Sequence, residues 1–429
     1  MGFDDARYPR KGGRNQMKAF HCFLVGGWMG LVVVQAHAEG SEGVMDALTG
    51  GTVHLNLRVR YEHADQDGRE SANAATIRAR LGYETMPLSG VSALVEFEGT
   101  ETLEKSDYNA AGVHGNSAKT VIADPESAEF NQAMLKYAGF DSVFKAGRQR
   151  IILDNARFVG NVGWRQNEQT FDAASLLNHS LGSLDVFYAY LGQVNRIFGS
   201  EADGAQRRLN SDSHLANVAF KVTTNLTLTA YGYFLDFESA AGLSSDTVGV
   251  RAKGAIAIGE DVHLGCLVEY AYQSDSGDNP VSYDADYLHL MAKGSIMGVT
   301  AGVGFELLGS DGTGVNDEGV DTFSSFQTPL ATLHAFNGWA DKFLTTPDEG
   351  LEDLYVYLGA KLPLSIHGKV VYHDFGSDEQ SIDYGEEIDA SLVKSINAST
   401  KLIAKYAHFN ADERFMDTDK FSIEANFAF

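Results

Sequence analysis

The sequence predicts an all-β fold, namely a closed antiparallel transmembrane β-barrel of about 18 strands, within a range of about 16–18. Three observations indicate this class. Long segments alternate apolar and polar residues with a period of two. The connections between these segments alternate between short turns and longer polar loops. The final segment, FSIEANFAF, carries its apolar residues on one face and ends on the aromatic Phe429.

An export signal opens the chain. In residues 17–38, the basic Lys18 is followed by an apolar run and then by Ala36-His37-Ala38. This order is typical of a cleaved secretory signal peptide. The apolar run is too short to span a membrane as a helix. We therefore expect residues 1–38 to be removed, with Met17 as an alternative start. A short periplasmic segment, 39–51, would then precede a barrel over residues 52–429.

The charge of the predicted mature chain excludes one class of partner. Loss of residues 1–38 leaves 28 Lys and Arg against 56 Asp and Glu, a net charge of −28. Because such an acidic chain repels phosphate backbones, we expect no nucleic-acid partner. Cys22 lies in the signal segment, and Cys266 alone cannot form a disulfide within one mature chain.

The predicted strands begin with TVHLNLRVRYE, residues 52–62, in which every second residue is apolar. Transmembrane strands need about 9–11 residues, whereas strands of soluble sandwiches usually have about 5–6, so the length of the segments favours the barrel. The expected strands are 52–62, 75–86, 91–101, 128–138, 143–152, 170–178, 183–191, 213–221, 225–237, 246–256, 262–273, 283–294, 299–308, 351–361, 364–375, 387–395, 398–409 and 419–429.

The connections predict the orientation of the barrel. Joins after even-numbered strands are short, as in PLSG, GFDS and HSLG, whereas joins after odd-numbered strands include the long segments 102–127 and 309–350. This is the arrangement of periplasmic turns opposite extracellular loops, and an even strand count puts both termini in the periplasm. The last strand, ending on Phe429, is similar to the signal that outer-membrane barrels present to their assembly machinery.

Charged side chains predict which strand faces line the lumen. An arginine facing lipid at mid-bilayer costs about 2–4 kcal/mol, so two arginines on one strand face mark the inward side. This places Arg58, Arg60, Arg78 and Arg80 inward. Glu96 and Glu98 share the polar face of the next strand and are expected inward as well. Arg148 and Arg150 share a parity and are expected inward too, which would send Lys145 and Gln149 outward unless the strand carries a bulge.

Motifs of catalysis and cofactor binding do not occur in the sequence. It has no GxSxG elbow, HExxH, CxxC or phosphate-binding loop, so we expect no enzyme, no cofactor and no metal site. The pair Glu96 and Glu98 could act in acid/base hydrolysis, but two carboxylates on one strand face are also what a lumen wall provides. The acidic segment 311–319 could bind calcium, yet it lacks EF-hand spacing and is equally a solvated loop.

Two segments carry a family resemblance. Residues 147–176, beginning GRQRIILDNARFVGNVGWRQNEQ, and residues 326–347, FQTPLATLHAFNGWADKFLTTP, resemble the alginate-export family of bacterial outer-membrane barrels. The resemblance implies a monomeric 18-stranded barrel with an electropositive constriction for acidic sugar polymers. It assigns four arginines to that constriction: Arg148, Arg150, Arg157 and Arg165. The chain departs from the family in having short turns at every periplasmic connection, which favours a more general channel.

The functional expectation is a passive channel for anionic or polar solutes, including acidic saccharides such as alginate. The segment 309–350 is long enough to fold inward as a plug, with Phe326, Phe336 and Trp339 as anchors. The expected location is the outer membrane of a Gram-negative bacterium, and the expected partners are its lipids, the assembly machinery and the solute. Alternatives are a cation-preferring diffusion porin, a barrel hydrolase and a surface adhesin.

Overall fold

The structure of the protein is a computed structural model that describes residues 41–429, except 104, 260, 313, 317–320 and 323. The predicted signal peptide, 1–38, and the alternative start at Met17 lie outside the described residues. Among the described residues, no helix is long and apolar enough to cross a membrane.

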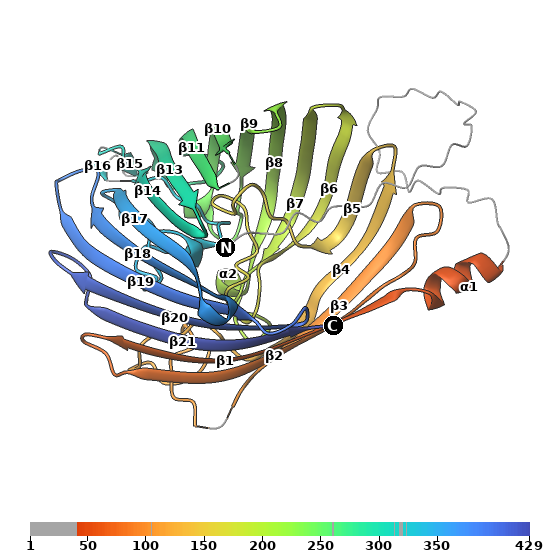
Figure 1. Cartoon of the computed structure of the whole chain (residues 1–429), viewed down its shortest axis with the longest axis horizontal. Helices are drawn as coiled ribbons and strands as arrows, with labels where there is room; N and C mark the ends of the chain where they lie inside the picture. The colour runs from red at the N-terminus through yellow and green to blue at the C-terminus, as the bar shows by residue number, and fades with distance from the viewer. Residues whose placement is uncertain (1–40, 104, 260, 313, 317–320, 323) are drawn as a thin grey trace. The chain divides into compact units, whose positions relative to one another are not determined.

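Residues 42–429 form one unit, built on an 18-stranded antiparallel sheet (Figure 1). The first strand, β1, pairs with both β2 and the last strand, β21, so the sheet closes into a barrel. Closure satisfies the backbone groups that an open sheet edge would leave exposed in lipid. Its strands are β1 (Thr52–Gln66), β2 (Ala72–Glu84), β3 (Val91–Thr102), β4 (Ser127–Gly139), β5 (Ser142–Gln149), β6 (Thr170–Leu181), β7 (Leu184–Asn195), β8 (Arg208–Thr223), β9 (Leu226–Leu235), β10 (Ser245–Ile258), β11 (Val262–Asp275), β13 (Asp284–Ile296), β14 (Val299–Leu308), β17 (Leu351–Leu362), β18 (Ile366–Gly376), β19 (Asp383–Ser395), β20 (Thr400–Ala411) and β21 (Thr418–Ala428).

The predicted fold class, a closed antiparallel barrel of about 18 strands, is confirmed. Some strand boundaries differ from the expected ones, including two where strands meet long loops. The strand expected at 143–152 ends at Gln149, and the strand expected from 213 begins at Arg208. Alternation identifies a strand, but it does not tell where the neighbouring strand stops offering hydrogen-bond partners.

The remaining elements are small and are not strands of the barrel wall. The segment before β1 contains the helix α1 (Ser41–Thr49). Short helical turns occur in the connections, and three short strands form a separate sheet in the order β12-β15-β16. These elements are α2 (Gly204–Arg207), η1 (Ala241–Leu243), η2 (Leu333–Ala335), η3 (Pro363–Ser365), β12 (Val281–Ser282), β15 (Gly314–Asn316) and β16 (Asp321–Thr322).

The two ends of the barrel differ in their connections. At the short-turn end, β4 and β5 are joined by residues 140–141, and β13 and β14 by residues 297–298. At the long-loop end, residues 150–169 join β5 to β6, and residues 309–350 join β14 to β17. This alternation of short and long connections around the barrel is the arrangement that the sequence predicts.

The strand faces follow the predicted alternation. On β3, Val95 and Phe97 point outward and are 47% and 46% exposed, whereas Glu96 and Glu98 are buried inside. At the long-loop end, outward-facing tyrosines donate hydrogen bonds to carboxylates on the next strand, as Tyr406 does to Asp419 at 2.6 Å. An apolar outer band with tyrosines at its margin is what a transmembrane barrel presents to lipid.

Inside the barrel, aromatic side chains form the core toward the long-loop end. Phe158, from the loop between β5 and β6, packs against Tyr231 and Tyr287 of the wall at ring-centroid distances of 5.2 Å each. A second aromatic group centres on Phe343 of the 309–350 loop, which lies 4.5 Å from Phe375. The core therefore lies between the inner face of the barrel and the loops that enter it.

Candidate functional site

Two long loops enter the lumen and contact each other there. We call residues 150–169 the first inward loop and residues 309–350 the second inward loop. The backbone N–H of Thr332 donates to the carbonyl of Ala156 at 2.9 Å, and that of Gly160 donates to Leu330 at 2.8 Å. A Cβ at Gly160 would collide with Oγ1 of Thr332 in the second inward loop, so the close approach of the two loops requires a glycine there.

The predicted plug anchors lie at this junction of loops and wall. Phe326 is fully buried and packs 5.4 Å from Tyr287. Phe336 lies under the guanidinium of Arg157 at 4.9 Å, and Trp339 is half-buried beside β20. The three aromatic residues thus hold the second inward loop against the inner face of the barrel.

Arg157, from the first inward loop, is buried and neutralised. Its guanidinium pairs with Glu306 of β14 at 2.6 Å and also donates to Thr328 and Asn337 of the second inward loop. Burial alone would lower the pKa of Arg157, but the adjacent Glu306 carboxylate raises it overall. Arg157 therefore joins the two loops to the wall and offers no free charge to a solute.

The inward faces of β1 and β2 form an arginine wall. We use this term for Arg58, Arg60, Arg78 and Arg80, whose side chains are all buried within the lumen. Arg60 pairs with Glu424 at 2.6 Å and with Asp124 at 3.1 Å, and Arg80 pairs with Glu98. Arg58 lies 3.4 Å from Glu424.

Arg78 differs from the rest of the wall because no carboxylate lies within ion-pair distance of it in the described part of the chain. It donates instead to the side chain of Asn56 and, at 3.4 Å, to the carbonyl of Gln166. Within the same described residues, Nε of Arg78 has no hydrogen-bond acceptor, whereas Nε of Arg58 makes the ion pair with Glu424. Arg78 and its cross-strand neighbour Arg58 are thus buried side by side, and of the two it is Arg78 that has no carboxylate partner among the described residues.

Two further arginines of the predicted set lie inside but are paired. Arg150 pairs with Glu96 at 2.7 Å and with Glu168. Burial alone would raise the pKa of Glu168, but Arg80 and Arg150 lower it to about 2. Arg165 pairs with Asp341 at 2.8 Å and with Glu62 at 3.2 Å.

The expectation for Arg148 is wrong. Arg148 points outward, where Asp172 on the neighbouring strand holds it through two contacts of 2.7 and 3.0 Å. Gln149 instead points inward and receives a hydrogen bond from Ser175 at 2.7 Å, and Lys145 shares its face. Because β5 ends at Gln149, Arg150 belongs to the loop and is free of the strand's alternation.

Several charged residues at the site were not singled out from the sequence. Glu424 and Lys405 face inward on β21 and β20, and their parity within the predicted strands is the signal that could have identified them. Loop residues such as Asp124 and Asp341 carry no comparable signal, since irregular backbone has no period.

Metal ligands do not gather in the described residues: no group of three or more His, Cys, Asp or Glu side chains there is placed to hold an ion. The acidic segment 311–319, for which calcium was an alternative, lies partly outside the described residues.

Comparison with known proteins shows the fold. No family model matches the sequence, and no curated protein sequence matches it either. Among solved structures, the chain is similar to OccAB2 of Acinetobacter baumannii, with a TM-score of 0.69, 14% identity, and coverage of 90% of this chain and 99% of that one. It is also similar to OccK9 (OpdG) of Pseudomonas aeruginosa, with a TM-score of 0.66, 13% identity, and coverage of 89% and 99%. OpdL of the same organism has a TM-score of 0.66 at 16% identity, with coverage of 89% and 99%.

The class that the fold defines is therefore the closed 18-stranded barrel of outer-membrane porin structures. The narrower likeness to the alginate-export family rests on the two sequence segments alone.

Proposed function

We propose that the protein is an outer-membrane channel for the passive passage of anionic or polar solutes. The observation that carries the proposal is Arg78, a guanidinium of the arginine wall that contacts the first inward loop and has no carboxylate partner in the described part of the chain. Charged side chains in a constriction select permeating ions and solutes. The similarity to porin structures supports a channel.

The apolar outer band supports a location in the outer membrane of a Gram-negative bacterium. Tyrosines whose hydroxyls point to carboxylates at the long-loop end, such as Tyr270 donating to Asp286 at 2.5 Å, fit the boundary between lipid tails and headgroups. In this orientation the long loops are extracellular and the short turns periplasmic. The barrel would act as a monomer, assembled through the strand that ends on Phe429.

Within this function, acidic saccharides such as alginate are the finer proposal. The resemblance of residues 147–176 and 326–347 to alginate exporters supports it, as does the positive charge of Arg78, which no described carboxylate neutralises. The short periplasmic turns favour passage of short acidic saccharides over gated export of a polymer.

A cation-preferring diffusion porin is the second candidate. Glu387 and Asp389 are fully buried carboxylates on the inward face of β19, and the only ion pair that Asp389 makes within the described residues is with His373 at 3.7 Å. Such carboxylates would attract cations to the wall at β19.

Planar-bilayer recording tests these proposals. We expect the wild type to give discrete conductance, with a reversal potential under a salt gradient that shows anion preference. Arg78→Gln should shift that potential toward cations, because it removes the donor without a paired carboxylate. Arg148→Gln is the matched control, since Arg148 lies on the outer face and should leave selectivity unchanged.

The outcomes separate the candidates. Cation preference that Arg78→Gln leaves unchanged would favour the diffusion porin. Block of the current by short uronate oligomers, and not by neutral ones, would support the acidic-saccharide proposal. A barrel without conductance that hydrolyses lipid or polysaccharide would favour a hydrolase, and one that only binds a surface partner would favour an adhesin.

A further inference from the structure

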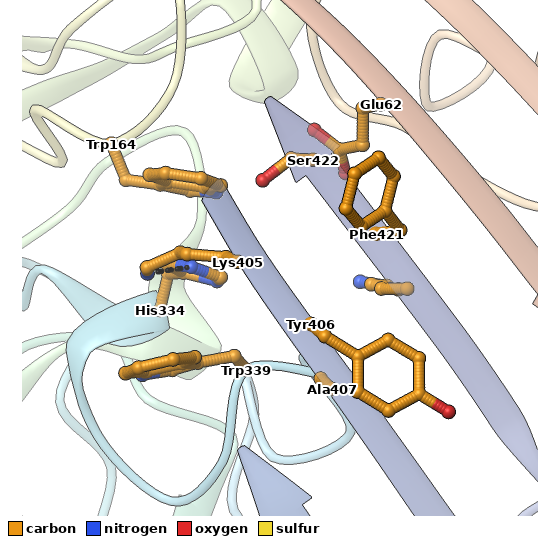
Figure 2. Close-up of a pocket in the computed structure, with 10 residues that line it drawn as sticks. Glu62, Trp164, His334, Trp339, Lys405, Tyr406, Ala407, Phe421 and Ser422 are labelled. Carbon is orange, nitrogen blue, oxygen red and sulfur yellow. Dashed lines mark hydrogen bonds between the residues drawn. The ribbon is translucent and has the colours of Figure 1, made fainter. Parts of the chain in front are cut away.

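A lysine of the barrel wall lies between two tryptophans, one from each inward loop. The Nζ of Lys405, on β20, is 4.0 Å from the ring centre of Trp164 and 4.1 Å from that of Trp339 (Figure 2). The same ammonium group donates to Nε2 of His334 at 2.9 Å. The His334 ring in turn stacks on Trp164, with centroids 4.4 Å apart and planes 7° from parallel.

His334 links this stack to a carboxylate. Its Nδ1 lies 2.6 Å from Oδ1 of Asp341, and Oδ2 of Asp341 accepts from Arg165 and from Lys420, each at 2.8 Å. Burial lowers the pKa of His334 to about 3, so the neutral ring accepts from Lys405 on one side and donates to Asp341 on the other.

The contacts therefore join pieces of chain that are far apart in sequence. The first inward loop contributes Trp164 and Arg165, and the second contributes His334, Trp339 and Asp341. The wall contributes Lys405 from β20 and Lys420 from β21, while Glu62 of β1 holds Arg165 at 3.2 Å. We call Trp164, Arg165, His334, Trp339, Asp341, Lys405 and Lys420 the clasp.

The turn that the clasp holds also covers the arginine wall. Nη1 of Arg58 donates to the carbonyls of Gly163, Trp164 and Arg165, at 3.1, 3.2 and 3.1 Å. Arg60 donates to the carbonyl of Trp164, and its guanidinium lies 4.0 Å from the Trp164 ring. Movement of this turn away from the wall would widen the lumen and would also release donors of Arg58 and Arg60.

We propose that the clasp sets both the width and the anion preference of the lumen, with Lys405 and Asp341 as its positioning residues. This inference rests on the proposed function as a channel. Lys405 is the point at which both loops meet the wall, and Asp341 is the acceptor that neutralises the cations around it. Loss of either side chain releases the loops without changing a strand of the barrel.

Single-channel recording on Lys405→Met and Asp341→Asn tests the proposal. Both variants should show higher conductance, more frequent switching between current levels, and a reversal potential shifted toward anions. Lys405→Arg should restore the behaviour of the wild type, because a guanidinium can also lie between two aromatic rings. Lys401→Met is the matched control, since Lys401 is exposed on the same strand and lies outside the set of described residues that form the clasp.

A second readout does not require conduction. Arg165 is buried, so trypsin should cleave the folded wild type slowly there and cleave Lys405→Met and Asp341→Asn faster, with Lys401→Met unchanged. If the wild type does not conduct but the cleavage rates differ as expected, the proposed channel function is wrong, whereas the role of the clasp in holding the loops is supported. Equal conductance and equal cleavage in the wild type and both variants, with all barrels folded, would overturn the clasp.

Discussion

At the scale of single residues, the lumen of this barrel is a set of buried charges whose partners decide their effect. Arg78 and Arg157 are each 1% exposed, yet Arg157 is held by Glu306 whereas Arg78 contacts only neutral acceptors in the described part of the chain. A paired guanidinium stabilises the loops, whereas a guanidinium without a carboxylate partner adds to the positive potential of the lumen wall. The number of arginines therefore matters less than their pairing.

Arg157→Met should destabilise the protein. The substitution leaves Glu306 buried without its cation, and breaking a buried pair costs about 3–5 kcal/mol. The measurement is the apparent unfolding temperature of the purified barrel in detergent. The double variant Arg157→Met with Glu306→Gln should recover part of the loss, because no uncompensated charge remains. If Arg157→Met unfolds at the same temperature as the wild type, the stabilising role of the Arg157–Glu306 pair is contradicted.

His334 should make stability depend on pH. Its pKa is about 3 in the folded protein and 6.5 in the unfolded chain, where it is no longer buried beside Asp341, Lys405 and Arg165. Between these values the unfolded chain binds more protons, so the unfolding free energy falls as pH falls, by at most about 1.4 kcal/mol per pH unit.

His334→Gln removes this titration. Its unfolding temperature should change less than that of the wild type from pH 6.5 to 4.5, above the range in which Glu168 and Asp341 lose their charge. The same slope in both proteins would mean that the ring is already charged in the folded state.

At the scale of elements, the two inward loops act as one unit because their backbones meet at Gly160. Gly160→Val should separate them, since a side chain there would collide with Thr332 of the second inward loop. We expect higher conductance with a barrel of unchanged strand content by circular dichroism. Gly242→Val is the control, because a Cβ at Gly242 meets no atom within 4 Å. Unchanged conductance in the first variant would indicate that the loops do not limit the current.

Strand β5 shows how far alternation can be used at this scale. Arg148 and Arg150 have the same parity, but β5 ends between them and only Arg150 turns into the lumen. Asp172 on β6 neutralises Arg148 on the outer face, where an unpaired arginine would be costly. A strand end near a long loop is set by its partners in space, so parity alone does not place the residues that follow it.

At the scale of the whole molecule, the chain end closes the barrel. The backbone N–H of Phe429 donates to the carbonyl of Leu55 at 2.8 Å, and the N–H of Leu55 donates to Phe429 at 3.1 Å. Deletion of Phe429 should lower the amount of assembled, heat-modifiable barrel in outer-membrane fractions, because it removes both bonds and the terminal aromatic. Phe427→Leu keeps strand length and apolarity and serves as the control. Normal assembly after the deletion would exclude a role of the last residue.

The sequence by itself determined the barrel and the faces of its strands. Period-two alternation is a local property of the backbone, so the inward placement of Arg58, Arg60, Arg78 and Arg80 followed from their spacing. Only the tertiary structure decided the pairing of these charges and the conformation of the inward loops. Arg165 and Asp341 meet across 176 residues of sequence, and irregular backbone has no period that could bring two such positions together in advance.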